Sequence, residues 1–177
     1  MTVSAPNEPE FEPNTDELLG HNATYAAEFD DEPLDTAPQR QLAIVACMDS
    51  RMDIFGILGL GHGEAHVIRN AGGVITDDVV RSLCLSQRLL GTREIILMHH
   101  TDCGLQKVTD DAFKAELQAE LGVKPDWSLE SFVDPVADVR QSMRRLELSP
   151  FIAYKHHIRG FVYDVFTGLL DEVGRDG

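Results

Sequence analysis

Five side chains that could carry out chemistry stand directly after two short apolar runs of the sequence. They are Cys47, Asp49, Arg51, His100 and Cys103. The apolar runs, 42–46 and 95–98, are typical of strands buried in a sheet. Because functional loops of parallel sheets follow the carboxyl ends of strands, two such ends can converge on one site. Two thiols and one imidazole form a zinc ligand set that leaves the fourth tetrahedral position for water or a carboxylate.

Each cysteine alone is weak evidence for a metal, because a free cysteine is more often a small buried hydrophobe. Cys84 lies on the apolar face of an expected helix, and we interpret it as a packing residue. Cys47 and Cys103 differ from it, because both follow core strands and have histidine, aspartate or arginine within four residues. For this joint pattern we favour the zinc interpretation over core packing.

His99 and His100 compete for the third ligand position, because neighbouring residues of a strand point to opposite faces. The short separation of His100 from Cys103 lets one turn present both side chains, so we favour His100. His99 is then expected to face the core or a helix. The other histidines are expected to be solvated or packed, and a proton relay through His156 and His157 is a less favoured hypothesis.

Asp49 and Arg51 face the same way if the chain after Cys47 stays extended. A neighbouring guanidinium keeps a carboxylate ionised and fixes its orientation. Alone, such a pair is interpreted as a salt bridge that secures a loop. Beside a zinc site with an open position, the oriented carboxylate can instead accept the proton of a metal-bound water. Gly72 and Gly73 are a weaker signal, because they permit either close backbone approach or simply a tight turn.

The apolar runs and capping residues predict an α/β fold with a mostly parallel central β-sheet flanked by helices. Strands are expected at 41–46, 65–69, 94–99, 160–166 and 169–173, the last as an edge strand. Helices, caps included, are expected at 15–29, 52–60, 76–91, 110–121 and 134–150. Thr15 and Thr76 are the expected N-caps of the first and third, and Asp134 before Pro135 marks the expected start of the last. The strand–helix–strand order in the middle of the chain is a βαβ unit, which requires parallel strands. Three parts are expected: a disordered acidic tail (1–14), an N-terminal helical arm with its linker (15–40) and a zinc domain (41–177).

Composition and charge exclude several classes of function. The formal net charge is −15, from 15 basic and 30 acidic residues, and no basic stripe offers a surface to nucleic acid or an anionic membrane. No apolar run approaches the roughly 18 residues of a membrane span. The first residues show no basic segment followed by an apolar one, so we expect no signal peptide. Three cysteines, two of them in the candidate site, fit a reducing cytoplasm better than a disulfide framework.

Three motifs of the sequence resemble the signature set of the β-class carbonic anhydrases. They are Cys47-x-Asp49-x-Arg51, Arg69-Asn70-Ala71-Gly72 and His100-x-x-Cys103-Gly104. The length and the C-terminal segment 159–164 are most similar to the small actinobacterial-type members. The resemblance covers approximately residues 41–173, and it is highly specific because the three motifs occur together in the family's order.

This resemblance implies roles for seven residues. The zinc ligands are Cys47, His100 and Cys103, the catalytic dyad is Asp49 and Arg51, and the substrate pocket is lined by the backbone of Gly72 and Gly73. It further implies one Zn²⁺ per chain. The implied assembly is a homodimer or homotetramer in which the N-terminal helix reaches across to a partner subunit.

The implied activity is the reversible hydration of carbon dioxide to bicarbonate and a proton. Zinc lowers the pKa of a bound water from about 15.7 towards neutrality, which gives hydroxide as the nucleophile, and Asp49 would orient it. An alternative on the same site is the hydrolysis of carbonyl sulfide or carbon disulfide. A less favoured alternative is a non-catalytic zinc protein, in which Asp49 closes the coordination sphere and the acidic arm recruits a partner. Carbon dioxide hydration compared with sulfide release would separate these hypotheses.

Overall fold

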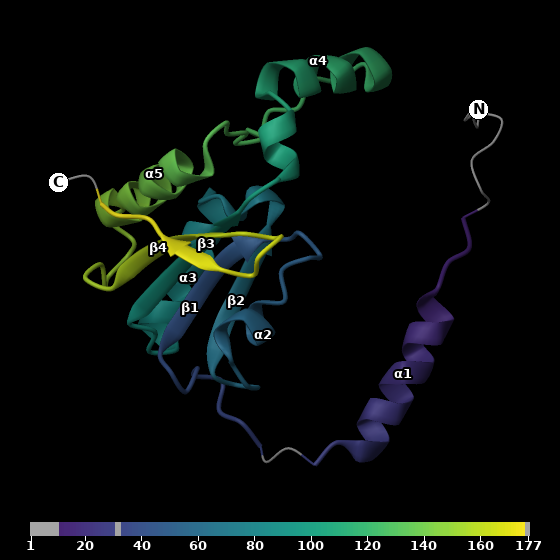
Figure 1. Ribbon diagram of the computed structural model, residues 1–177, viewed down its shortest axis with the longest axis vertical. Coiled ribbons are helices and arrows are strands. Elements are labelled where there is room, and N and C mark those ends of the chain that lie inside the picture. The colour runs from purple at the N-terminus through teal and green to yellow at the C-terminus, as the bar shows by residue number, and fades with distance from the viewer. Residues whose placement is uncertain (1–10, 31–32, 176–177) are drawn as a thin grey trace. The chain divides into compact units, whose positions relative to one another are not determined.

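The computed structural model describes residues 11–30 and 33–175, and the part of the chain after residue 34 contains a five-stranded sheet (Figure 1). The strands are β1 (Leu42–Cys47), β2 (Ala65–Asn70), β3 (Glu94–His100), β4 (Ile158–Tyr163) and β5 (Leu170–Glu172). Their order across the sheet is β2-β1-β3-β4-β5; the first four are parallel, and β5 runs antiparallel to β4. The mostly parallel α/β fold predicted from the sequence is confirmed.

Helices and 3-10 turns connect and flank these strands. They are α1 (Thr15–Glu28), α2 (Ile54–Leu58), η1 (Ala71–Gly73), α3 (Asp77–Leu89), η2 (Gly104–Lys107), α4 (Asp110–Leu121) and α5 (Pro135–Leu148). Two predicted caps are confirmed. The Thr76 hydroxyl accepts a hydrogen bond from Val79 N (3.4 Å) at the start of α3, and the Asp134 carboxylate accepts one from Val136 N (2.9 Å) at the start of α5. Each cap satisfies an N–H group that a helix start would otherwise leave unpaired.

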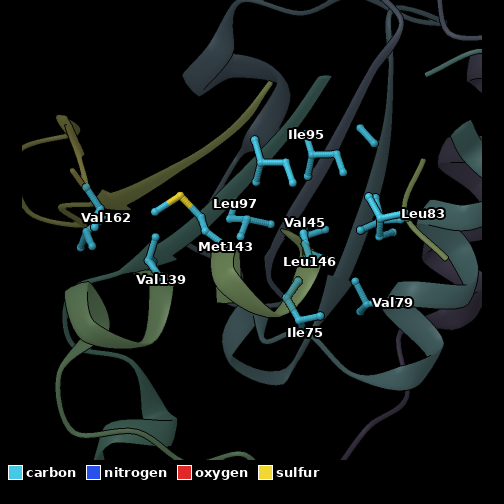
Figure 2. Close-up of a cluster of buried hydrophobic side chains, with 14 residues drawn as sticks. Val45, Ile75, Val79, Leu83, Ile95, Leu97, Val139, Met143, Leu146 and Val162 are labelled. Atoms are coloured by element: carbon cyan, nitrogen blue, oxygen red, sulfur yellow. The ribbon is translucent and has the colours of Figure 1, made fainter. Parts of the chain in front are cut away.

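One face of the sheet is covered by α3 and α5. Ala43 and Val45 of β1 point to this face, where α3 packs on β1 and β2, and α5 packs on β3 and β4. Figure 2 shows the resulting core, in which Met143 and Leu146 of α5 lie beside Leu97 of β3. Full burial of one such aliphatic side chain stabilises the fold by roughly 1.5–3 kcal/mol. This core therefore holds β1 and β3 in a fixed register.

The opposite face of the sheet is covered less completely. Its core cluster includes Cys47 and is completed by α2 and by the loops that follow β1 and β3. The helix α2 has only five residues, because Asp53 caps its first turn and Gly59 ends it with a φ of +63°. Towards β4, side chains such as Ile96 and Phe161 are only partly buried. The candidate site lies at the edge of this face, where β1 and β3 end.

The last two strands differ most from the sequence prediction. β4 occupies Ile158–Tyr163, whereas a strand was expected at 160–166. The reason is a turn at Asp164, whose Oδ1 accepts hydrogen bonds from Phe166 N (2.7 Å) and Thr167 N (3.1 Å). Because this turn takes residues out of both neighbouring strands, the return strand β5 is also shorter than expected.

The chain divides into two compact units, one ending at Leu34 and the other beginning at Asp35. The first contains α1, which has Asn14 at its N-cap and no side-chain cap bond, so the predicted cap at Thr15 is wrong. The expected disorder of the acidic tail falls mainly on residues 1–10, which lie outside the described residues, and the expected division into three parts stays a prediction. None of the described helices is long and apolar enough to cross a membrane.

Candidate metal centre

The structure brings together the three residues predicted to bind zinc. β1 and β3 are parallel neighbours, paired at Ala46 and Met98, so Cys47 and His100 emerge at the same edge of the sheet. The turn that follows β3 then returns Cys103 to this point, just before η2. One possible ligand atom of each residue lies within 4.8 Å of the other two, and all three residues are buried. Such a cluster has the size and the donor types of a zinc site.

His100 presents an unbonded ring nitrogen to this cluster. Its Nδ1 lies 2.9 Å from Thr101 O, and because a carbonyl oxygen can only accept, Nδ1 carries the proton. Its Nε2 therefore has a free lone pair, and this atom is buried without a hydrogen-bond partner. A hydrogen bond from the remote nitrogen to a backbone carbonyl commonly fixes the tautomer and orientation of a metal-binding imidazole. The orphaned Nε2 thus fits a metal ligand.

The two thiols titrate differently. The pKa of Cys47 is lowered to about 4, chiefly by a hydrogen bond from Cys103, although burial opposes the shift. The backbone N–H groups of Asp49 and Gly72 also stabilise the Cys47 thiolate. The pKa of Cys103 is raised, because its proton is held by the Cys47 sulfur and burial disfavours a second negative charge. A bound cation would stabilise both sulfurs as thiolates and so favour the loss of their protons.

Asp49 lies beside the cluster, with its Oδ2 3.7 Å from Nε2 of His100. Arg51 holds this carboxylate through Nε to Oδ1 (2.9 Å), Nη2 to Oδ2 (2.7 Å) and its backbone N to Oδ1 (2.9 Å). These hydrogen bonds keep the pKa of Asp49 well below its usual range, and Asp49 in turn raises the pKa of Arg51. The arrangement is an ionised and oriented carboxylate next to an unbonded imidazole nitrogen.

Comparison with known proteins identifies the family. A family model described as carbonic anhydrase matches residues 42–149. Over 159 residues, which are 90% of this chain and 97% of the other, the sequence is 58% identical to β-carbonic anhydrase 1 of Mycobacterium tuberculosis. This chain belongs to the β-carbonic anhydrase family.

This β-carbonic anhydrase is also similar to a solved structure and to a relative of lower sequence identity. A crystal structure of carbonic anhydrase from Streptococcus mutans has a TM-score of 0.87 at 40% identity, covering 93% of this chain and all of that one (100%). A carbon disulfide hydrolase of Acidithiobacillus thiooxidans is 33% identical over 74% of this chain and 76% of its own length. One relative of this chain is therefore named for a different substrate, carbon disulfide.

Gly72 and Gly73 form the turn η1 against the ends of β1 and β3. Their φ angles are +81° and +73°, a region that side-chain-bearing residues rarely adopt. A Cβ atom on Gly73 would lie 2.8 Å from Cys47 N and 3.0 Å from Met98 O, and one on Gly72 would lie 2.5 Å from Leu105 Cδ1. The pair therefore forms a turn and also lets the backbone approach the strand ends closely, and its role in a substrate pocket stays a prediction.

Arg69 supports the loop after β1, a contact that the sequence did not indicate. Its Nε donates to Cys47 O (2.9 Å) and its Nη2 donates to Asp49 O (2.7 Å). One guanidinium thus fixes the backbone at a candidate ligand and at the adjacent carboxylate. The sequence signals were the place of Arg69 at the end of a predicted strand and in the motif Arg69-Asn70-Ala71-Gly72. Neither signal indicated its targets, because backbone carbonyls leave no pattern of their own.

Asp102 is a second residue that sequence reasoning missed. It stands between His100 and Cys103, and its carboxylate pairs with both Arg51 (3.0 Å) and Lys107 (2.7 Å). An acidic residue between two candidate ligands is the signal that could have identified it. The candidate site therefore contains two carboxylates around one arginine.

The remaining sequence candidates lie away from the cluster. His99 points to the opposite face, where its Nε2 lies 2.6 Å from Asp138 Oδ2 of α5, as expected for a helix-facing histidine. Cys84 is partly buried within α3. His156 and His157 are exposed and precede β4, at the amino-terminal edge of the sheet, whereas the cluster lies at the carboxyl-terminal edge. The relay hypothesis therefore has no geometric support.

Proposed function

We propose that this chain catalyses the zinc-dependent, reversible hydration of carbon dioxide to bicarbonate and a proton. The observation that carries the proposal is a buried Cys–His–Cys cluster whose imidazole nitrogen has no partner, with an ionised carboxylate 3.7 Å from that nitrogen. Identity of 58% to a β-carbonic anhydrase over nearly the whole chain supports the same reaction.

In this proposal Cys47, His100 and Cys103 hold one Zn²⁺ per chain. Their chemistry fits the ion, because two thiolates and a neutral imidazole are typical zinc donors and the thiolates balance its charge. When bound, zinc is a Lewis acid that makes water a nucleophile near neutral pH. Three protein ligands leave one tetrahedral position free, so the neighbouring residues decide what reaches it.

Asp49 and Arg51 act on the attacking water. The carboxylate of Asp49 accepts a hydrogen bond from it at Oδ2, the oxygen that faces His100. Arg51 keeps this carboxylate ionised and holds both of its oxygens, so that it serves as an oriented acceptor. An acceptor that is already oriented lowers the activation barrier of the reaction, because the entropy cost of orienting it is not part of that barrier.

The backbone of Gly72 and Gly73 would line the carbon dioxide pocket. Without Cβ atoms, η1 lies directly against the strand ends, and the Gly72 N–H donates to the Cys47 sulfur. The buried Val74 and Leu105 add apolar surface beside this turn. Apolar surface beside the cluster would suit a small uncharged substrate.

Metal analysis combined with a carbon dioxide hydration assay over about pH 6 to 9 tests the proposal. We expect one zinc per chain and a rate that rises with pH, because the nucleophile is formed by ionisation of water. A full zinc complement without hydration at any pH would contradict the proposal and favour the non-catalytic interpretation.

The second candidate function is hydrolysis of carbon disulfide or carbonyl sulfide. It is favoured by the 33% identity to a carbon disulfide hydrolase, which is well below the 58% shared with the carbonic anhydrase. Sulfide release measured in the same preparation separates the two. A rate of sulfide release above that of carbon dioxide hydration would favour this second function.

We also propose that the protein is a cytoplasmic homodimer or homotetramer. The arm helix α1 buries none of its residues, and Leu18, Leu19 and Tyr25 are each more than half exposed (56%, 61% and 52%). Such an apolar surface favours a contact with a second copy of the chain. The three free cysteines fit a reducing compartment. Deletion of residues 1–36 should weaken association in sedimentation experiments, and a monomeric full-length protein would contradict the proposal.

A further inference from the structure

Arg51 is bonded to two carboxylates, although the proposed mechanism uses only one of them. Besides its bonds to Asp49, Nη1 of Arg51 donates to Asp102 Oδ2 (3.0 Å) and Nη2 donates to Asp102 O (3.1 Å). Since Nε and Nη2 also bond Asp49, all three guanidinium nitrogens have an acceptor. The guanidinium therefore bridges the loop after β1 and the turn after β3.

Asp102 is itself fixed at both carboxylate oxygens. Oδ2 accepts from Arg51, and Oδ1 lies 2.7 Å from Nζ of Lys107 at the end of η2. The backbone at Asp102 has a φ of +55°, a left-handed conformation that is uncommon for residues other than glycine, asparagine and aspartate. In this conformation both the carbonyl oxygen and the carboxylate of Asp102 reach Arg51.

Exposure alone would make this contact weak. The side chains of Arg51 and Asp102 are 42% and 39% exposed, and isolated exposed ion pairs contribute little. Bidentate geometry within a network is the exception to that rule. Arg51 and Lys107 form such a network with Asp49 and Asp102, because every oxygen of both carboxylates has a cationic partner.

We propose that Asp102 is a positioning residue for the reaction proposed above, and that it acts through Arg51. It holds the guanidinium so that Nε and Nη2 stay directed at Asp49. Without Asp102, the long and half-exposed arginine side chain keeps only Asp49 as a carboxylate partner, and the two side chains can move together. This inference rests on the proposed function.

The left-handed backbone at position 102 allows two variants that preserve the turn. Asp102→Asn keeps an acceptor oxygen but loses the charge, and Asp102→Gly loses the whole side chain; both residue types tolerate a positive φ. Glu172→Gln is the matched control, because it alters another exposed bidentate pair, in which Nε and Nη2 of Arg159 each lie 2.8 Å from a Glu172 oxygen.

The direct test measures the mobility of the Arg51 side chain by ¹⁵N relaxation of its Nε–H group, assigned by its loss in Arg51→Ala. In the wild type and in Glu172→Gln we expect an order parameter near that of rigid backbone, about 0.85, and in Asp102→Gly a value below about 0.6. This measurement needs no catalysis, so it decides the inference even if the proposed function fails. An unchanged order parameter in Asp102→Gly would overturn the inference.

The second test is a double-mutant cycle in carbon dioxide hydration. We expect kcat to fall about threefold in Asp102→Asn and about tenfold in Asp102→Gly, with zinc content and KM unchanged. In an Arg51→Ala background, Asp102→Gly should change the residual rate less than about twofold, because its effect passes through Arg51. A tenfold loss in that background, or loss of zinc from both variants, would show that Asp102 supports the ligand turn itself and would overturn the inference.

Discussion

Two neighbouring histidines at the end of β3 serve the two faces of the sheet in different ways. His99 and His100 are both fully buried, and each ring has one bonded and one unbonded nitrogen. On one face, His99 bonds Asp138 of α5 and stacks on Phe132, with ring centroids 5.0 Å apart. On the other face, His100 bonds the carbonyl of Thr101 and turns its free nitrogen towards two thiols.

This difference teaches that an unbonded imidazole nitrogen does not by itself mark a metal ligand, because the neighbouring groups decide its role. Burial of an imidazole is unfavourable on either face unless a partner compensates. The carboxylate of Asp138 is that partner for His99, and it ties β3 to α5. For His100 the compensating partner would be the metal. Substitutions on the two faces should therefore separate metal binding from stability.

The largest effect is expected on the His100 face. His100→Ala and Cys103→Ser should each lose zinc and hydration activity completely, because two remaining ligands cannot hold the ion at physiological concentrations. Cys84→Ser is the matched control, and it should keep both properties, because Cys84 lies in α3 outside the cluster. Metal analysis of the purified proteins checks this prediction. A full zinc equivalent in Cys103→Ser would show that the ligand set is wrong.

A somewhat smaller loss of activity is expected from substitution of Arg51, which should lower the rate without removing the metal. Arg51→Ala should keep its zinc, because Arg51 contacts carboxylates and not the thiols or the imidazole. Its rate should fall about 10- to 100-fold, because Asp49 loses the group that orients it and can approach the metal instead. Arg51→Lys should recover only part of the rate, since lysine lacks the planar fork.

X-ray absorption of zinc-loaded Arg51→Ala at mildly alkaline pH shows which atoms surround the metal. An additional carboxylate oxygen is expected if Asp49 moves when Arg51 is absent. A rate within about twofold of the wild type would contradict the catalytic role of the pair. An unchanged coordination sphere with a reduced rate would assign Arg51 a role other than holding Asp49 off the metal.

Substitution on the opposite face of β3 should lower stability and leave zinc binding and activity unchanged. Asp138→Ala leaves Nε2 of His99 buried without a partner, which should lower the free energy of unfolding by about 1–3 kcal/mol. Zinc content and activity should stay near wild type, because Asp138 makes no bond to the cluster residues. Urea unfolding of the metal-free proteins measures the change. Gln141→Ala, on the exposed side of α5, is the control and should change stability by less than about 0.5 kcal/mol.

Sequence patterns were sufficient where a residue's role follows from its place along the chain. The period of two in β3 predicted that only one of His99 and His100 could face the cluster, and the structure agrees. The positions of Cys47 and Cys103 after core strands predicted their convergence, since parallel strands end together. The caps at Thr76 and Asp134 were predictable because they depend on neighbours within four residues.

Contacts between distant parts of the chain were not predictable in this way. Asp102 and Arg51 are 51 residues apart, and their pairing depends on a left-handed backbone at Asp102 that no local pattern specifies. Arg69 binds backbone carbonyls, which every residue carries, so its targets left no signal. The end of β4 was misplaced because the turn at Asp164 overrode a β-compatible sequence beyond it.

The smallest expected effect on the free energy of unfolding comes from a change at Asp110. Unlike the two histidines, which each keep one unbonded nitrogen, Asp110 has a partner for each of its oxygens. At the start of α4, Oδ1 accepts from the N (3.0 Å) and Oγ (2.8 Å) of Ser131, and Oδ2 accepts from Ser128 Oγ (3.0 Å) and Leu129 N (2.9 Å). These donors, above all the backbone N–H of Ser131, hold the pKa of Asp110 well below its usual range. The carboxylate thereby fixes the loop before α5.

The folded-state pKa of Asp110 lies below the unfolded-state value of about 3.9, so its stabilisation is complete above that pH and is lost as the pH falls through the folded-state value. Asp110→Asn should therefore lower the free energy of unfolding by about 1 kcal/mol at neutral pH, and its difference from wild type should shrink below about pH 4. Urea unfolding of both proteins across this range measures the difference. Asparagine has the same shape as aspartate, so a difference that stayed constant would mean that the charge of Asp110 does not hold the loop.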